Sequence, residues 1–329
     1  MKSRGFVTGL GLAAAMLTST AALAQDLPSW NDTASRQAIV DFVTAATTEG
    51  DEGYVAPEDR IAVFDNDGTL WSEYPTYFQA LFIFDRVREM APDHPEWADE
   101  QPFKGVLDGD MAAVAATGEE GLMKLVAVTH AGSTDEEFTA AVTEWFTTAR
   151  HPDSGRPFTE MTFEPMIEVL EYLRDNGFQT WIVSGGGIDF MRPMTEDVYG
   201  IPPQQVVGSQ IGKEYQVIDG KPQLVRTPEL FFLDDKVGKP VGISRHIGKR
   251  PVMAFGNSDG DYEMLEYTTS GDGPSLGVIV HHTDAVREYA YDRDSQAGKL
   301  DRALDDAPKN GWVIIDMAAD WARVNADPQ

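Results

Sequence analysis

The sequence lacks cysteine entirely and has few basic residues for its length of 329 residues. Without cysteine, neither a disulfide bond nor a cysteine-linked lipid is possible, so the fold must be held by its hydrophobic core. The chain has 26 lysine and arginine residues but 54 aspartate and glutamate residues, which gives a formal net charge of −28. This charge argues against nucleic acid and anionic membranes as partners, because both would be repelled. An anionic substrate would need a local cation.

The first 24 residues have the composition of a signal peptide. Lys2 and Arg4 precede an apolar run over residues 5–17, and residues 22–24 provide the small side chains of a cleavage site. The run is too short for a membrane anchor, which needs about 20 apolar residues. We therefore expect cleavage after Ala24 and export to the periplasm or beyond.

The stretch over residues 61–71 carries the strongest signal in the chain. Ile61–Phe64 is apolar without alternation, which is typical of a strand covered on both faces of a parallel sheet. Asp65 and Asp67 follow, and ligands bind beyond the carboxyl ends of such strands. Two crowded carboxylates repel unless a cation lies between them or one takes a proton, and both remedies favour catalysis. A solvated turn is the alternative reading of these residues alone.

Residues 72–159 are rich in alanine, methionine, phenylalanine and glutamate at helical spacing. Four helices are predicted here, over residues 77–90, 110–116, 119–127 and 135–149. A crossover between parallel strands needs only about a dozen residues, so a block of this length indicates an inserted helical cap. The cap would occupy residues 72–159, and residues 25–71 and 160–329 would form the core.

Two further predicted strands also end in polar loops that contain glycine. Residues 178–183 lead into Ser184 and three glycines, a pattern typical of a phosphate-binding loop, although a flexible turn fits equally well. Residues 251–255 lead into a loop with Asn257 and Asp261. Between them, residues 205–228 alternate as in an antiparallel hairpin.

Lys236 and Lys239 lie between the second and third of these loops. Lys239 is the preferred candidate for a buried site cation, because it opens a helix that returns the chain to the strand over residues 251–255. Lys236 remains the alternative.

The order and spacing of these loops resemble the four motifs of haloacid dehalogenase superfamily phosphatases. Across residues 60–265 the matching positions are Asp65-Asn-Asp67-Gly-Thr69, Ser184, Lys239 and Gly256-Asn257-x-x-x-Asp261. The resemblance is greatest to the phosphoserine-phosphatase-like branch with a helical cap of the first type. It implies an α/β fold with a three-layer, Rossmann-like parallel sheet, an inserted cap and a small hairpin.

The resemblance also implies a role for each motif residue. Asp65 would attack phosphorus to form an aspartyl-phosphate, and Asp67 would act as general acid and then general base. Ser184 and the amide of Gly185 would hold phosphate oxygens, and Lys239 would neutralise their charge. A carboxylate at Asp67 favours phosphate ester hydrolysis over carbon–halogen cleavage.

Mg²⁺ is the cofactor that the resemblance implies. Its ligands would be Asp65, the backbone carbonyl of Asp67, and Asn257, with Asp261 as the second carboxylate of the fourth motif. Asn257 departs from the family pattern, in which an aspartate is usual at this position. The site would therefore carry one negative charge fewer.

The expected partner is a small-molecule phosphate ester, with no nucleic acid or membrane, and the sequence does not specify an oligomeric state. Trp71, Glu73 and Tyr74 follow the nucleophile, and an acidic residue among aromatic residues would suit a cationic alcohol. Arg192 is a candidate anchor for an anionic group. Two alternatives stay open: a phosphonatase or dehalogenase on the same fold, and a non-catalytic binding protein with a degraded metal site at Asn257.

Overall fold

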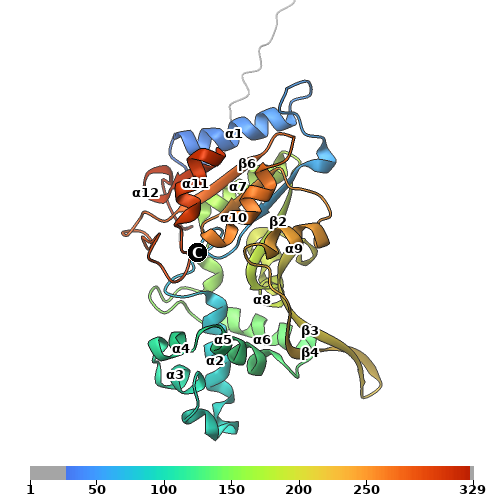
Figure 1. Cartoon of the computed structure of the whole chain (residues 1–329), viewed down its shortest axis with the longest axis vertical. Coiled ribbons are helices and arrows are strands. Elements are labelled where there is room, and N and C mark those ends of the chain that lie inside the picture. The colour runs from blue at the N-terminus through green and yellow to red at the C-terminus, as the bar shows by residue number, and fades with distance from the viewer. Residues whose placement is uncertain (1–26, 327–329) are drawn as a thin grey trace, which may run out of the picture.

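A seven-stranded sheet forms the centre of the molecule (Figure 1), which we describe from a computed structural model over residues 27–326. The expected signal peptide, residues 1–24, lies outside the described range. The strand order is β4-β3-β2-β1-β5-β6-β7. The strands are β1 (Ile61–Phe64), β2 (Gln179–Gly187), β3 (Val206–Ile218), β4 (Lys221–Phe232), β5 (Met253–Gly256), β6 (Leu276–His281) and β7 (Val313–Asp316).

In the part of the sheet ordered β3-β2-β1-β5-β6-β7, each strand runs parallel to its neighbours. At the edge of the sheet, β4 pairs with β3 in antiparallel fashion. β1 lies between β2 and β5, with Ile61 opposite Gln179 and Ala62 opposite Met253. The three strands that precede the predicted site loops are therefore adjacent, and their carboxyl ends meet at one edge. The predicted α/β class with a mainly parallel, Rossmann-like sheet is confirmed.

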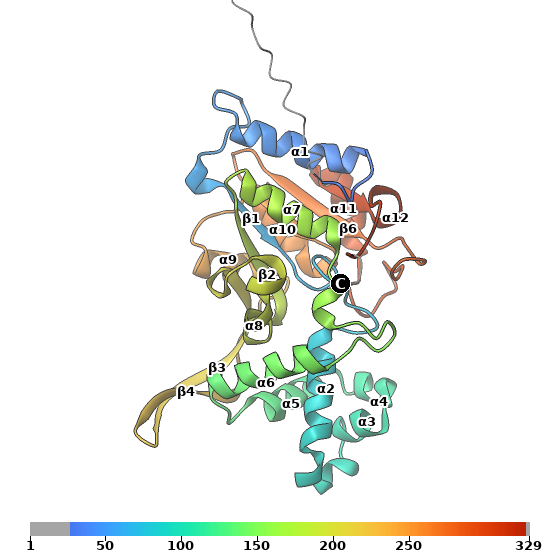
Figure 2. The ribbon, with the colours of Figure 1, turned by 180° about the vertical axis from the view of Figure 1, so that it is seen from behind.

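Helices cover both faces of the sheet, as the unbroken apolar pattern of β1 predicts. Ala62 and Phe64 pack in one core with residues of α1, α7 and α8, whereas Ile61 and Val63 pack in the other with residues of α9, α10 and α11. Figures 1 and 2 show these two layers from opposite sides. The helices are α1 (Ala34–Thr47), α7 (Glu164–Asp175), α8 (Ile188–Tyr199), α9 (Gly238–His246), α10 (Tyr262–Thr269), α11 (Arg302–Asn310) and α12 (Met317–Asp320).

A separate group of helices fills the stretch between β1 and α7 and lies below the sheet in Figures 1 and 2. It consists of α2 (Phe78–Met90), α3 (Phe103–Asp108), α4 (Met111–Ala116), α5 (Gly118–His130) and α6 (Asp135–Thr148). α6 begins with a capping box, in which Thr134 and Glu137 satisfy each other's backbone amides. α3 was not predicted. The division into core and cap at residues 72 and 159 stays a prediction.

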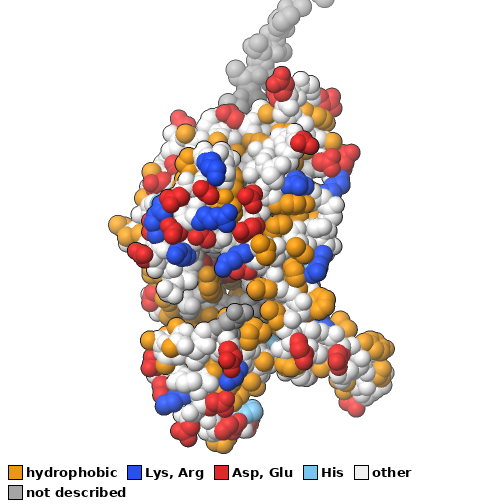
Figure 3. All heavy atoms as spheres, viewed as in Figure 1, with side chains coloured by type: hydrophobic (Ala, Val, Ile, Leu, Met, Phe, Trp, Pro, Cys, Tyr) orange, Lys and Arg blue, Asp and Glu red, His pale blue; other side chains and the backbone are white. Residues whose placement is uncertain are grey.

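The β3–β4 hairpin is longer than the expected excursion over residues 205–228, and it projects from the molecule (Figure 1). Large apolar side chains are exposed along it, and Figure 3 shows them gathered on the projection. They are Tyr215, Val217, Ile218, Leu224, Leu230 and Phe231. The base of the hairpin packs against α5 and α6.

The helix predicted over residues 298–304 is wrong at its start, because α11 begins at Arg302. Residues 298–301 instead pass over the side chain of Glu73, and Gly298 has a φ of +61°. The carboxylate of Asp259 accepts hydrogen bonds from the backbone amides of Asp301, Arg302 and Ala303, which sets the first turn of α11. Among residues 27–326, no helix is long and apolar enough to cross a bilayer.

Candidate active site

The loop after β1 brings Asp65 to the centre of the sheet edge. The backbone amide of Asp65 continues the ladder by donating to the carbonyl of Phe255 at 2.9 Å. Gly68 has a φ of +74°, and a Cβ there would lie 2.0 Å from Asn257 Nδ2. Only glycine therefore permits this loop to turn tightly against the loop after β5.

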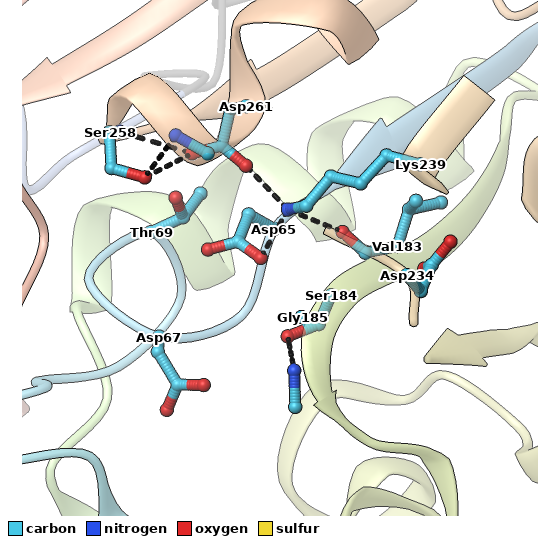
Figure 4. Close-up of polar contacts among 12 residues, drawn as sticks. Asp65, Asp67, Thr69, Val183, Ser184, Gly185, Asp234, Lys239, Ser258 and Asp261 are labelled. Carbon is cyan, nitrogen blue, oxygen red and sulfur yellow. Dashed lines mark hydrogen bonds and ion pairs between the residues drawn. The ribbon is translucent and has the colours of Figure 1, made fainter. Parts of the chain in front are cut away.

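Lys239 is the cation at the centre of the site. Its Nζ donates to Asp65 Oδ1 at 2.7 Å, Asp261 Oδ1 at 2.5 Å and the carbonyl of Val183 at 3.0 Å (Figure 4). The side chain is only 2% exposed. Burial by itself lowers the pKa of Lys239, but the carboxylates of Asp261 and Asp65 raise it well above its ordinary value, so the group stays charged. Lys236 is exposed and lies at the rim of the cavity.

The two aspartates of the loop are held differently. Burial, followed by the charge of Asp261, raises the pKa of Asp65 to about 8, and Lys239 opposes this shift. Burial also raises the pKa of Asp67 to about 6, against a hydrogen bond from Trp71 Nε1 at 2.8 Å. Lys239 bonds to Asp65 directly, whereas Trp71 bonds to Asp67.

The carboxyl end of β2, which holds Ser184 and three glycines, lines the same cavity as these carboxyl groups. Ser184 Oγ accepts the amide of Gly186 at 3.1 Å, and Gly185 lines the same cavity. The amide of Gly187 donates to Gln79 Oε1, at 2.7 Å, on the first turn of α2. This contact ties the glycine-rich end of β2 directly to the helices that follow β1.

Both oxygens of Asp261 are already in use. Oδ1 accepts from Lys239, and Oδ2 accepts from the backbone amides of Asn257 and Ser258, each at 3.0 Å. Asp261 therefore holds the lysine and shapes the loop after β5. The side chain of Asn257 contacts the loop after β1, where Thr69 Oγ1 donates to its Oδ1 at 3.3 Å.

Glu73 lies against this site and is 2% exposed. Its Oε1 accepts from Asn257 Nδ2 and from Tyr291 Oη, both at 2.7 Å. Burial raises the pKa of Glu73 well above its ordinary value, and the hydrogen bond from Tyr291 is the largest opposing influence. The structure thus joins a residue after β1 to a segment more than two hundred residues later.

A cavity of about 530 Å³ opens at this edge of the sheet and contains most of the predicted site. It is lined by Asp65, Asp67, Glu73, Ser184, Gly185, Lys239 and Asp261, among others. A second cavity, of about 650 Å³, lies among α6, α7 and α8 and contains none of them.

Three residues that the sequence placed near the substrate do not line the cavity around Asp65. Trp71 is buried and bonded to Asp67, and the Tyr74 ring packs against the rings of Tyr289 and Tyr291. Arg192 Nε donates to the carbonyl of Pro203 at 3.0 Å. Their roles in substrate binding stay predictions without support from their positions.

Comparison with known proteins agrees with this geometry. A family model described as haloacid dehalogenase-like hydrolase matches residues 62–266, which is more than half of the chain. The chain belongs to the haloacid dehalogenase-like hydrolase family. The matched range contains all four predicted motifs, and the predicted family is confirmed.

Solved structures similar to this hydrolase support the fold. A protein with unknown function from Bordetella pertussis Tohama I is 16% identical, with a TM-score of 0.51, and the match covers 78% of this chain and 98% of that one. A conserved functionally unknown protein from Anaerococcus prevotii DSM 20548 is 17% identical, with a TM-score of 0.52 and coverages of 88% and 94%. No curated protein matches the chain. Identities this low show the shared fold alone.

The oxygen atoms of this hydrolase's site fit a hard divalent cation. The described residues contain no cluster of three histidine, aspartate or glutamate side chains spaced to hold a metal. Suitable donors are instead of three kinds: the Asp65 carboxylate, the Asp67 backbone carbonyl and the Asn257 amide oxygen. Oxygen atoms of this type are what Mg²⁺ prefers, with water and substrate phosphate completing its coordination.

Sequence reasoning missed several residues that support the site. His282 Nε2–H donates to the carbonyl of Gly68 at 2.7 Å, and burial lowers the pKa of this histidine to about 3, so the ring is neutral. Only its position after β6, beside His281, hinted at this role. Gln79 and Tyr291 had no local signal, because each acts on a loop more than one hundred residues away.

Proposed function

We propose that this protein is a phosphatase that hydrolyses small phosphomonoesters, and that it belongs to the phosphoserine-phosphatase-like branch of its family. The observation that supports this most is the contact of Lys239 with both Asp65 and Asp261 at the base of the cavity. A buried lysine among carboxylates neutralises charge at the point where a phosphate would enter an acidic protein.

Asp65 is the proposed nucleophile. It lies at the end of a buried strand, where its position is fixed by the sheet, and Oδ1 is held by Lys239. Attack by the free carboxylate oxygen forms a bond to phosphorus and breaks the bond to the leaving oxygen. The Ser184 hydroxyl and the Gly185 amide, which belong to β2 and line the same cavity, would hold the phosphate oxygens.

Asp67 is the proposed general acid and base. Its raised pKa, about 6, suits a group that gives a proton to the leaving oxygen and then takes one from water. Trp71 holds Oδ1 at 2.8 Å, which leaves Oδ2 for the proton transfer. Because the cavity contains Asp67 beside Asp65, ester hydrolysis is favoured over dehalogenation, which needs no such acid.

Mg²⁺ is the proposed cofactor, held by Asp65, the backbone carbonyl of Asp67 and Asn257. When bound, it would neutralise the charge of the phosphate and of Asp65. We assign Asp261 a positioning role, because both of its oxygens are bonded to other groups.

The proposed location is outside the cytoplasm, on the composition of residues 1–24. Expression of the full chain in a Gram-negative host should release a periplasmic form that begins at Gln25. Recovery of protein with an intact Met1 from the cytoplasm alone would contradict export.

A colorimetric aryl phosphate tests the activity directly. Wild-type protein should release phosphate with Mg²⁺ and lose this activity in chelator, whereas Asp67→Asn should lower kcat by about 10²- to 10⁴-fold. Asn keeps the volume of the side chain and the acceptor for Trp71, so a loss would report the missing proton. Unchanged turnover in this variant would contradict the acid–base role, and no hydrolysis with any divalent metal would favour a non-catalytic binding protein.

A further inference from the structure

The side chain of Asn257 can serve a cation site in only one of its two orientations. The amide has one oxygen, which can bind a cation, and one NH₂ group, which cannot. An aspartate, which is usual in the family at this position, presents an oxygen at either end. The substitution of asparagine therefore creates a requirement that the amide be held in the correct orientation.

The contacts of Asn257 meet this requirement at both ends. Nδ2 donates to Glu73 Oε1 at 2.7 Å, and Oδ1 accepts from Thr69 Oγ1 at 3.3 Å. Glu73 Oε1 also accepts from Tyr291 Oη, so it faces Asn257 as an acceptor: it can bond to the NH₂ group but would repel the amide oxygen. The oxygen is therefore turned away from Glu73 and toward the loop that carries Asp65.

Glu73 is in turn held by the segment over residues 282–301, which follows β6. Tyr291 Oη donates to the same Oε1 at 2.7 Å, and its ring stacks on His282 with centroids 4.3 Å apart. Gly298 lets the segment pass directly over Glu73, since a Cβ there would lie 1.8 Å from Oε1. Both Tyr291 and Gly298 lie beyond residue 266, where the family match ends.

We propose that Glu73 is a positioning residue for the metal site: it fixes the amide of Asn257 so that Oδ1 is available to Mg²⁺, and Tyr291 keeps Glu73 in place. Asn257 and Glu73 together replace the aspartate that is usual in the family at position 257. This inference rests on the proposed Mg²⁺ site and extends the function of that site to a segment outside the matched domain.

Calorimetric titration of purified protein with Mg²⁺ alone tests the proposal without any activity measurement. Glu73→Met keeps the length of the side chain but removes the acceptor, and it should weaken Mg²⁺ binding by about 10-fold or more. Glu73→Gln can still accept from Nδ2 and Tyr291, so its affinity should stay within about 3-fold of wild type. Melting curves identify any variant that fails to fold.

In the Asn257→Asp background, a substitution at Glu73 should change Mg²⁺ affinity in the opposite direction. Asn257→Asp places a second carboxyl group against Glu73, and the two either repel or share a proton that competes with the cation. Adding Glu73→Gln should then strengthen Mg²⁺ binding, because the new amide can donate to the new carboxylate. Glu288→Gln, which removes a carboxylate from the same segment without a contact to Asn257, should leave affinity unchanged within about 2-fold.

Two results would overturn the inference while leaving the phosphatase proposal intact. One is Glu73→Met binding Mg²⁺ as tightly as wild type, and the other is Glu73→Gln failing to improve binding in the Asn257→Asp background. A wild-type protein that binds no Mg²⁺ would overturn this inference and the proposed cofactor together.

Discussion

The two ends of the cavity are built from different parts of the chain and in different ways. At one end, Lys239 from α9 lies within hydrogen-bond distance of Asp65 from the loop after β1 and of Asp261 from the loop after β5. At the other end, α2, α5, α8, the hairpin and the residue just after it contribute most of the large apolar side chains of the lining. These are Ile83, Leu122, Met123, Val126, Phe190, Ile211, Leu230 and Leu233.

This difference implies that the polar end determines the reaction, whereas the apolar end determines the preference among substrates. The polar end depends on atomic contacts of 2.5–3.0 Å, so a single substitution should affect every ester alike. The apolar end depends on shape and area, so a substitution there should affect esters according to their leaving groups.

The largest effect is expected from Lys239→Ala at the polar end. The change leaves Asp65 and Asp261 buried without their cation, and kcat should fall by about 10²- to 10³-fold for every phosphate ester. Steady-state kinetics on a small and a large ester would measure it.

Lys236→Ala is the matched control, because Lys236 is an exposed lysine three residues away. Its activity should stay within about 3-fold of wild type. Full activity in the Lys239 variant together with loss in the Lys236 variant would reject our assignment of the site cation.

A smaller and selective effect is expected from Leu122→Ser at the apolar end. Leu122 is 49% exposed, so the substitution should cost little stability. For a naphthyl phosphate, kcat/KM should fall by about 3- to 10-fold, whereas glycerol phosphate should be unaffected.

Leu224→Ser is the control for this variant, since Leu224 is exposed on the hairpin and does not line the cavity. An equal loss for both esters in the Leu122 variant would show that the apolar end does not discriminate among leaving groups.

The smallest effect on activity is expected at Asp234, although it lies close to the polar end. Asp234 is fully buried, and neither of its oxygens has a hydrogen-bond partner among residues 27–326. Burial raises its pKa to about 7, with Lys239 opposing. Because the folded state binds this proton more tightly than the unfolded state, its contribution to stability falls as pH rises from about 4 to 7.

Asp234→Asn should therefore be more stable than wild type at pH 8, by on the order of 2 kcal/mol, and the advantage should disappear near pH 4. Urea unfolding at both pH values measures this, with the exposed Asp272→Asn as control. An advantage of the same size at pH 4 would mean that ionisation of Asp234 is not the cause.

The sequence predicted the positions of Asp65 and Asp261 well, because each follows a strand that could be read locally. The apolar run before Asp65 implied a buried strand, and parallel strands carry their following loops to one edge. A predicted helix start favoured Lys239 over Lys236 as the site cation, and the structure places Lys239, not Lys236, against Asp65.

The rest of the site depends on contacts between distant segments, which leave no local pattern. Trp71 was expected near the substrate, but it packs inside and donates to Asp67. Glu73 was recognised as a candidate, yet its partners Asn257 and Tyr291 are 184 and 218 residues away. The start of α11 was misplaced for the same reason, because a side chain from another loop, Asp259, sets its first turn.

Chemical trapping at Asp65 tests the central claim most directly. Borohydride added during turnover of an aryl phosphate reduces an aspartyl-phosphate to homoserine, which peptide mass spectrometry locates in the chain. We predict homoserine at position 65 in wild-type protein, more of it in Asp67→Asn, and none without substrate or in Asp65→Asn. Sustained phosphate release with an unmodified Asp65, or turnover by the Asp65→Asn variant, would contradict the account.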